Sequence, residues 1–404
     1  MRKYYSVPLL FFVLAAAIGL FLRWQFISPT PGIRYTFFLH AHSHVMFLGW
    51  IFNVLFLAYV DHHLAGKKPK LFRNFFILLQ VLVVAMMISF PIQGYGLYSI
   101  IFSTVHTLAV IVFIILFFRL TRGPQSTSLW FARISLLFFF VSTAGPFSLG
   151  YLMANGLGNS VWYNFSIYYY LHFQYNGFFL FGIFSLYFQL LERRQLPFDP
   201  AAALSFGKWM AAACVPAYVL SILYAAPGLF FNVTGAIAAV IQLAALGRLI
   251  SEVWRTRKIL RADFHPLACG LFGIVLASLI LKSLLQTASA HPQLATMAYA
   301  LRPVVIAYLH LVLLGVITLF LLAWYVEMKF VKLQPARTAI IIILAGFIGS
   351  EICLVLMPWW STVAGTSVSP SLAVFSVSVL LLLGSCLFYR AYVLNKADKN
   401  QFYR

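Results

Sequence analysis

Residues 97–120 read LYSIIFSTVHTLAVIVFIILFFRL, a run that is apolar almost throughout and carries a single charged residue, Arg119, beside its end. At about 1.5 Å per residue, an α-helix of this length extends roughly 36 Å. That length crosses the ~30 Å hydrocarbon core of a bilayer. The run therefore predicts a membrane-spanning helix, and it places one histidine, His106, inside the membrane.

Similar apolar stretches recur along the whole chain. Of 404 residues, 63% are hydrophobic and 9% are charged, whereas soluble domains carry about 25% charged residues. We therefore expect an all-α integral membrane protein with twelve transmembrane helices, in a single polytopic domain over residues 1–404. The first stretch lacks a small-residue cleavage site and is interpreted as a retained helix. The predicted spans are residues 5–23, 37–61, 73–92, 97–120, 129–153, 165–191, 204–225, 228–250, 265–287, 301–326, 337–358 and 370–392.

We attribute the net charge of +20 to the orientation of the chain in the membrane and not to nucleic-acid binding. With the N-terminus inside, the loops assigned to the cytoplasm hold nearly all Lys and Arg residues, including the basic run 255–261, which is interpreted as a loop. The exceptions on the outer side are Arg23, Arg34, Lys282 and Arg302. This asymmetry follows the positive-inside rule. It predicts a multi-pass protein of a bacterial-type inner (cytoplasmic) membrane with both termini cytoplasmic, whose partner is the lipid bilayer and not nucleic acid.

Four histidines fall at a common depth in the predicted spans. His44, His106, His172 and His310 lie in the second, fourth, sixth and tenth spans, at a depth of about 10–14 Å from the outer surface. Ionisable residues inside a membrane are candidates for function, and neutral imidazole binds haem iron and copper. The alternative is that each histidine only hydrogen-bonds a neighbouring helix.

Three of these spans share a His followed five residues later by Gly: His44–Gly49, His172–Gly177 and His310–Gly315. The pattern suggests three repeats of four helices, over residues 1–128, 129–264 and 265–404. A second register, which aligns Phe-Leu-His40 with the later histidines, stays open. We expect the glycines to serve close helix packing.

Other polar residues in the apolar spans are candidates for the same site. His40 and His44 share a helix face while His42 points elsewhere, and we favour His44 because it lies deepest. Glu351 is the one acidic residue in the interior of a predicted span, because Asp61 is the last residue of its span. It fits a proton relay or a metal ligand, or a structural ion pair for which Lys282 is the candidate partner.

Two stretches carry a resemblance to known families. Tyr168-Tyr-Tyr-Leu-His172-Phe-Gln-Tyr-Asn176 resembles the sixth helix of the haem-copper oxidase superfamily, which includes the nitric oxide reductases. His42-Ser-His44-Val-Met46-Phe-Leu-Gly49 is similar to a stretch of the NnrS family, twelve-helix haem- and copper-containing proteins linked to nitric oxide metabolism. The resemblance implies a fold of three arcs of four helices.

The resemblance also implies a site. Haem b would be held by His42 or His44 with His310, and Arg302 would lie near its propionates. A second metal, copper or non-haem iron, would involve His172, with His106 as a replacement ligand. Asn176 stands where the families have Tyr or Glu, and with Tyr175 and Glu351 it completes the candidate catalytic set.

The implied activity is that of an oxidoreductase similar to nitric oxide reductase, with departures. Residues 204–225 contain no histidine, so a full haem-copper centre lacks ligands. No Cys-x-x-Cys-His motif occurs, so electrons would come from quinol or a cytochrome partner. Two other functions stay open: a haem-modifying enzyme similar to haem A synthase, against which the number of spans argues, and a proton-coupled transporter without a cofactor.

Overall fold

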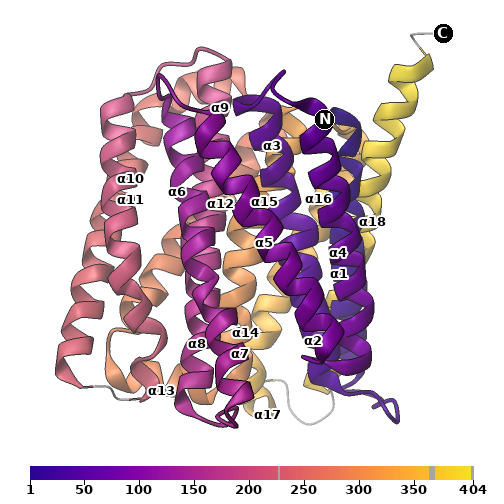
Figure 1. The fold of residues 1–404 in the computed structure, drawn as a ribbon, viewed down its shortest axis with the longest axis vertical. Coiled ribbons are helices and arrows are strands. Elements are labelled where there is room, and N and C mark those ends of the chain that lie inside the picture. The colour runs from indigo at the N-terminus through magenta and orange to yellow at the C-terminus, as the bar shows by residue number, and fades with distance from the viewer. Residues whose placement is uncertain (226–227, 364–368, 402–404) are drawn as a thin grey trace. The chain divides into compact units, whose positions relative to one another are not determined.

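The computed structural model describes residues 1–225, 228–363 and 369–401, and these residues form helices and no strand. Contacts divide the chain into two compact units. Unit 1 comprises Met1–Arg122 with Leu321–Arg404, and unit 2 comprises Gly123–Phe320. In each unit the long helices run side by side (Figure 1). The division into three four-helix repeats stays a prediction.

Unit 1 joins the first helices of the chain to the last ones. α1 packs on α2 and α18, α2 packs on α4, and α16 packs along α18. Tyr325 Oη donates to the carbonyl of Tyr5 at 2.9 Å and so links the two parts of the sequence. The helices of this unit are α1 (Ser6–Trp24), α2 (Tyr35–His44), η2 (Val45–Phe52), α3 (Asn53–His63), α4 (Pro69–Gln93), α5 (Leu97–Leu120), α15 (Leu319–Glu327, which begins in unit 2), α16 (Leu333–Leu356), α17 (Trp360–Val363) and α18 (Pro370–Gln401).

Unit 2 is built from the middle of the chain. α6 packs on α9 and η3, α10 on α11, and α12 on both α11 and η6. Its main helices are α6 (Thr127–Ser142), α7 (Ala144–Ala154), α8 (Val161–His172), η3 (Phe173–Phe179), α9 (Leu180–Arg193), α10 (Pro200–Ala217), α11 (Leu229–Asp263), α12 (Pro266–Ala288), α13 (Pro292–Ala300), α14 (Arg302–His310) and η6 (Leu311–Thr318). The basic run 255–261, interpreted above as a loop, is helical, because α11 continues to Asp263.

Eleven helices of the described chain are long and apolar enough to cross a membrane. Their outward faces are apolar: on α4, Ile77, Val81, Ile88 and Ile92 form a stripe with exposed fractions of 48–75%. Such a stripe would be an aggregation liability in water but is what a lipid-facing helix presents. The predicted span 165–191 is helical from Val161 to Arg193 but is not among the eleven, since its tyrosines, His172, Gln174 and Asn176 lower its hydropathy.

Polar contacts tie several chain segments together at one end of unit 1. The amino group of Met1 pairs with Asp61 at 3.0 Å. Lys67 Nζ donates to the carbonyl of Leu120 at 2.6 Å. The backbone N–H of Lys332 donates to the carbonyl of Ala391 at 3.0 Å near the end of α18. The N-terminus and the C-terminal part of α18 therefore lie at the same end of this unit.

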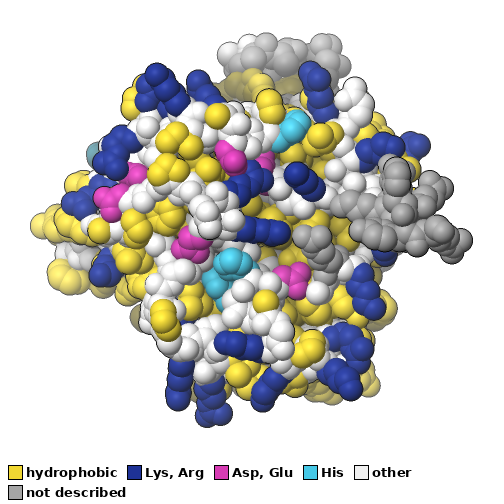
Figure 2. All heavy atoms as spheres, turned by 90° about the horizontal axis from the view of Figure 1, so that it is seen from above, with side chains coloured by type: hydrophobic (Ala, Val, Ile, Leu, Met, Phe, Trp, Pro, Cys, Tyr) yellow, Lys and Arg dark blue, Asp and Glu magenta, His cyan; other side chains and the backbone are white. Residues whose placement is uncertain are grey.

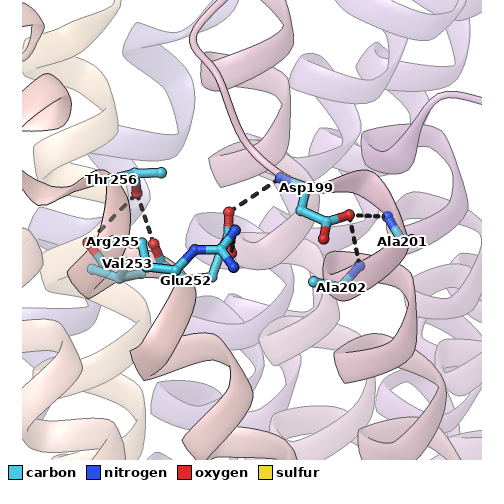
Figure 3. A network of polar contacts seen from close by, with 7 residues as sticks. All are labelled: Asp199, Ala201, Ala202, Glu252, Val253, Arg255 and Thr256. Carbon is cyan, nitrogen blue, oxygen red and sulfur yellow. Dashed lines mark hydrogen bonds and ion pairs between the residues drawn. The ribbon is translucent and has the colours of Figure 1, made fainter.

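At one end of unit 2, two carboxylates accept hydrogen bonds from backbone N–H groups. The Asp199 side chain caps α10 by accepting from the N–H groups of Ala201 and Ala202, and Glu252 of α11 accepts from the Asp199 N–H at 3.1 Å (Figure 3). A cap of this kind stabilises a helix by about 1 kcal/mol. Arg255 pairs with Glu252 at 2.9 Å. Basic side chains are numerous, and acidic ones few, on the face drawn in Figure 2.

Three helices widen at corresponding points of the sequence. The π-helical segments η2, η3 and η6 begin directly after His44, His172 and His310. In a π-helix the carbonyl of residue i accepts from the N–H of residue i+5, which is the spacing from each His to its Gly. The π-segments therefore place His44, and not His40, in the position that corresponds to His172 and His310. π-segments are frequent at functional sites.

Two of the glycines permit close helix packing, as predicted. A Cβ at Gly49 would lie 2.7 Å from Cγ of Phe11 on α1, and a Cβ at Gly177 would lie 2.6 Å from Phe138 on α6. In each case the phenylalanine comes from the preceding span. Inside lipid, association of helices depends on such close van der Waals contact because lipid is as apolar as the side chains.

Candidate functional site

The histidines of α2 point to two different neighbours. His40 and His44 both contact the ring of Phe90 on α4, with centroid distances of 6.1 and 4.3 Å. His42 instead contacts α1 through a hydrogen bond to Ala15. His40 and His44, four residues apart, therefore lie on one face of α2, as predicted. His42 lies on a different face from His44.

His42 is fixed by its contact with α1. Its Nδ1–H donates to the carbonyl of Ala15 at 2.9 Å. Gly19, one turn further along α1, leaves room for the ring, because a Cβ there would lie 3.0 Å from Cε1 of His42. A carbonyl only accepts, so the neutral ring carries its proton on Nδ1 and its lone pair on Nε2.

His44 has the same tautomer by a different route. Its Nδ1–H donates to the carbonyl of His40 in its own helix at 2.8 Å, and its ring stacks on Phe90. The side chain is half-buried, and Nε2 makes no hydrogen bond with any residue that the structure describes. An imidazole whose Nδ1–H is held by a backbone carbonyl and whose Nε2 is free is the usual form of a histidine ligand.

His106 of α5 adds a third imidazole to unit 1. Its side chain is 1% exposed, and neither ring nitrogen forms a hydrogen bond with the described residues. Its ring meets the edge of Phe52 at 5.6 Å, and His44 acts on it electrostatically. Burying an unpaired polar ring costs about 1–3 kcal/mol. Unit 1 therefore contains two imidazoles, His44 and His106, with nitrogens that make no hydrogen bond with the described residues.

In unit 2, His172 is engaged on both ring nitrogens. Its Nε2–H donates to the carbonyl of Cys214 on α10 at 2.8 Å, and Asn176 Nδ2 donates to its Nδ1 at 3.1 Å. Tyr175 lies beside it, with ring centroids 6.3 Å apart. His172, Tyr175 and Asn176 therefore lie together, as their positions within one helical turn require, whereas Glu351 of the predicted catalytic set belongs to unit 1. In this arrangement His172 has no free lone pair for a metal, since Asn176 occupies it.

His310 and Arg302 also belong to unit 2. His310 ends α14 and precedes η6, and its side chain is half-buried. Arg302 begins α14, is exposed, and acts electrostatically on Tyr168. The pairing of His42 or His44 with His310, and the place of Arg302 at a propionate, stay predictions.

The ionic neighbours of Glu351 and Lys282 differ from the expected pair. Glu351 on α16 interacts electrostatically with Arg23 of α1, and its Oε1 is buried without a hydrogen bond to the described residues. Lys282 on α12 donates to Gln286 Oε1 at 2.5 Å. Glu351 lies in unit 1 and Lys282 in unit 2. The suggestion that Lys282 is the partner of Glu351 finds no support in these contacts.

No compact metal site is assembled from the residues described. Over residues 1–225, 228–363 and 369–401, no three His, Cys, Asp or Glu side chains lie close enough to hold a metal ion. A second metal at His172 or His106 thus stays a prediction. Neither a family model nor a curated protein sequence matches this chain.

Some partners of the site were not expected from the sequence. Cys214 binds His172 through its backbone carbonyl, which any residue type provides, so the sequence holds no signal for it. Gln242 of α11 bonds Gln286 at 3.1 Å. An amide inside an apolar span was a usable signal for this second contact, because polar groups in lipid need partners.

Proposed function

We propose that the chain is a haem b-binding protein of the cytoplasmic membrane that handles or reduces nitric oxide by single-electron transfer. The observation that carries the proposal is the tautomer of His44, whose Nδ1–H is held by the His40 carbonyl at 2.8 Å while Nε2 is left unused. A haem iron takes an imidazole in this form. Iron bound there would supply nitric oxide binding and one-electron chemistry.

The residues of unit 1 fit an axial ligand better than those around His172. His44 offers Nε2 on a ring stacked against Phe90. His106 offers two buried nitrogens without hydrogen bonds to described residues, so ligation would remove a burial cost. We assign His44 as the first ligand, and His106 and His310 as the candidates for the opposite one. His42, held in the cradle of Ala15 and Gly19, is the alternative to His44.

The proposed topology has twelve crossings with both termini cytoplasmic. Met1 pairs with Asp61 and Lys332 bonds Ala391 at one end of unit 1, which supports an even number of crossings. Eleven apolar helices together with the helix from Val161 to Arg193 give that even number. The basic loops at this end favour the cytoplasmic side. Electrons would then come from quinol or a separate cytochrome.

The test is a reduced-minus-oxidised absorption spectrum of the detergent-purified chain, with haem measured as the pyridine haemochrome. We expect a b-type spectrum with one or two haems per chain. His44→Ala should lose the haem, whereas His291→Ala, at an exposed position, should keep it. Spectra of His106→Ala and His310→Ala then identify the opposite ligand. A haem-free protein from haem-supplied cells would overturn the proposal and favour a transporter without a cofactor.

A further inference from the structure

A polar stripe runs along the buried face of α12. Ser278, Lys282 and Gln286 are spaced four residues apart and are 7%, 3% and 6% exposed. Residues at this spacing lie one above another on a helix. The exposed side chains on this part of α12 are apolar: Leu281, Leu284 and Leu285. The stripe therefore points into unit 2 and away from lipid.

Lys282 makes one hydrogen bond in this stripe. Its Nζ donates to Gln286 Oε1 at 2.5 Å, and Gln286 Nε2 in turn donates to Gln242 Oε1 on α11 at 3.1 Å. The other titratable groups that act on Lys282 are His172 of α8 and Cys214 of α10. No acidic side chain in the described part of the chain forms an ion pair with it.

The amino group of Lys282 acts as a donor in its one hydrogen bond. The other N–H groups of this region donate elsewhere, since His172 Nε2–H donates to Cys214 and Gln286 Nε2 donates to Gln242. Gln286 presents its oxygen to Lys282. The ammonium thus keeps two N–H groups without an acceptor among the described residues.

A buried ammonium without a counter-charge is costly, and charged groups inside membranes pair or mark an ion pathway. Ser278, one turn from Lys282, adds a hydroxyl on the same buried face. We propose that Lys282 Nζ and Ser278 Oγ bind a small monovalent anion, such as chloride or nitrite, on the buried face of α12. This site does not depend on the proposed haem.

The experiment follows thermal unfolding of the full chain in detergent at pH 6, in a buffer whose only anion is gluconate. Addition of sodium chloride or sodium nitrite should raise the midpoint saturably, by about 2–4 °C for a chain of this size. Comparing the two salts shows whether a halide or an oxyanion binds more tightly. Lys282→Arg should retain the shift, and Lys208→Gln, at an exposed position in the same unit, should not change it.

Lys282→Gln should abolish the shift, and Ser278→Ala should weaken anion binding about tenfold, the usual worth of a hydrogen bond to a charged group. Equal shifts in the wild-type chain and Lys282→Gln would overturn the proposal, as would a wild-type chain that neither anion stabilises. Where Lys282→Gln does not fold, Ser278→Ala decides, because an unchanged affinity in that variant places the anion elsewhere.

Discussion

His44 of unit 1 and His172 of unit 2 stand at the same point of the same pattern, directly before a π-helical segment with a Gly five residues on, yet their rings are used differently. His44 bonds only a carbonyl of its own helix, so one nitrogen is unused. His172 is closed on both sides by Asn176 and Cys214. The motif sets the place of the imidazole, and the neighbours decide whether it is available as a ligand.

The residue four positions after each histidine accounts for part of the difference. It is Leu48 after His44 and Asn176 after His172. Leucine has no polar group to bond the ring, whereas the Asn176 amide donates to Nδ1 of His172 while the Cys214 carbonyl holds the proton on Nε2. In unit 1 the pattern therefore leaves an imidazole nitrogen without a hydrogen bond to the described residues, and in unit 2 both nitrogens of the imidazole are hydrogen-bonded.

Loss of haem should separate the two histidines most strongly. His44→Ala removes the proposed axial ligand, so we expect a fall in haem affinity of more than about a hundredfold, beyond the loss typical of an outer-shell partner. His172→Ala should keep the haem content of the wild type. The pyridine haemochrome assay of both purified variants measures this. The comparison fails if His172→Ala loses haem while His44→Ala does not.

The loss of unfolding free energy should be larger in His172→Ala than in His44→Ala, the reverse of the order expected for haem loss. His172→Ala leaves the Asn176 amide and the Cys214 carbonyl without their partner in the protein interior, which costs about 1–3 kcal/mol of unfolding free energy. His44→Ala removes a half-buried ring whose hydrogen bond is local, so the apoprotein should lose less. Thermal or denaturant unfolding of the haem-free variants gives the comparison. A larger loss in His44→Ala would contradict it.

A smaller change in stability is expected at the contact of His42 with Ala15 and Gly19 of α1. Gly19→Ala places a methyl group 3.0 Å from Cε1 of His42, so the ring or α1 has to shift. We expect a loss of about 1 kcal/mol and a displaced His42 resonance. Gly247→Ala is the matched control, because a Cβ at that position would have no other atom within 4 Å and alanine favours a helix interior. Equal stability changes in both variants would remove the role of Gly19.

The tautomers themselves can be read without any substitution. In the haem-free chain labelled with ¹⁵N-histidine, His42 and His44 should carry their proton on Nδ1, and His172 should carry it on Nε2. The ¹⁵N chemical shifts distinguish the two forms, with assignment by single His→Ala variants. A Nδ1–H tautomer at His172 would show that the Cys214 contact is not formed.

The apolar runs made the helices predictable. Long runs bounded by charged loops gave spans close to those of α4, α5 and α12, and Pro69, Pro200 and Pro266 mark helix starts because proline is tolerated in the first turn. The face shared by His40 and His44 followed from local helix geometry. The continuation of α11 to Asp263 was missed, since the basic run 255–261 is exposed and its charge resembles that of a loop.

Contacts between helices were not predictable in the same way. Glu351 of α16 acts on Arg23 of α1, and Gln286 of α12 bonds Gln242 of α11, because helix neighbours are set by tertiary packing that one sequence does not reveal. The π-segments were also not predicted. The hydrophobic pattern of a span indicates which residues are buried. In a span buried on nearly all sides, that pattern has no periodicity from which the number of residues per turn can be read. The Gly at i+5 was the available signal.

Each π-segment also gives its helix an extra residue relative to regular α-helical winding. Removing one residue from a regular α-helix rotates all following residues of that helix by about 100° about its axis. The apolar side chains of the lipid-facing stripe would then no longer face the lipid. In η2, η3 and η6 a one-residue deletion would instead return the turn to regular winding. We therefore expect these three places to tolerate a one-residue deletion inside the bilayer better than a regular spanning helix does.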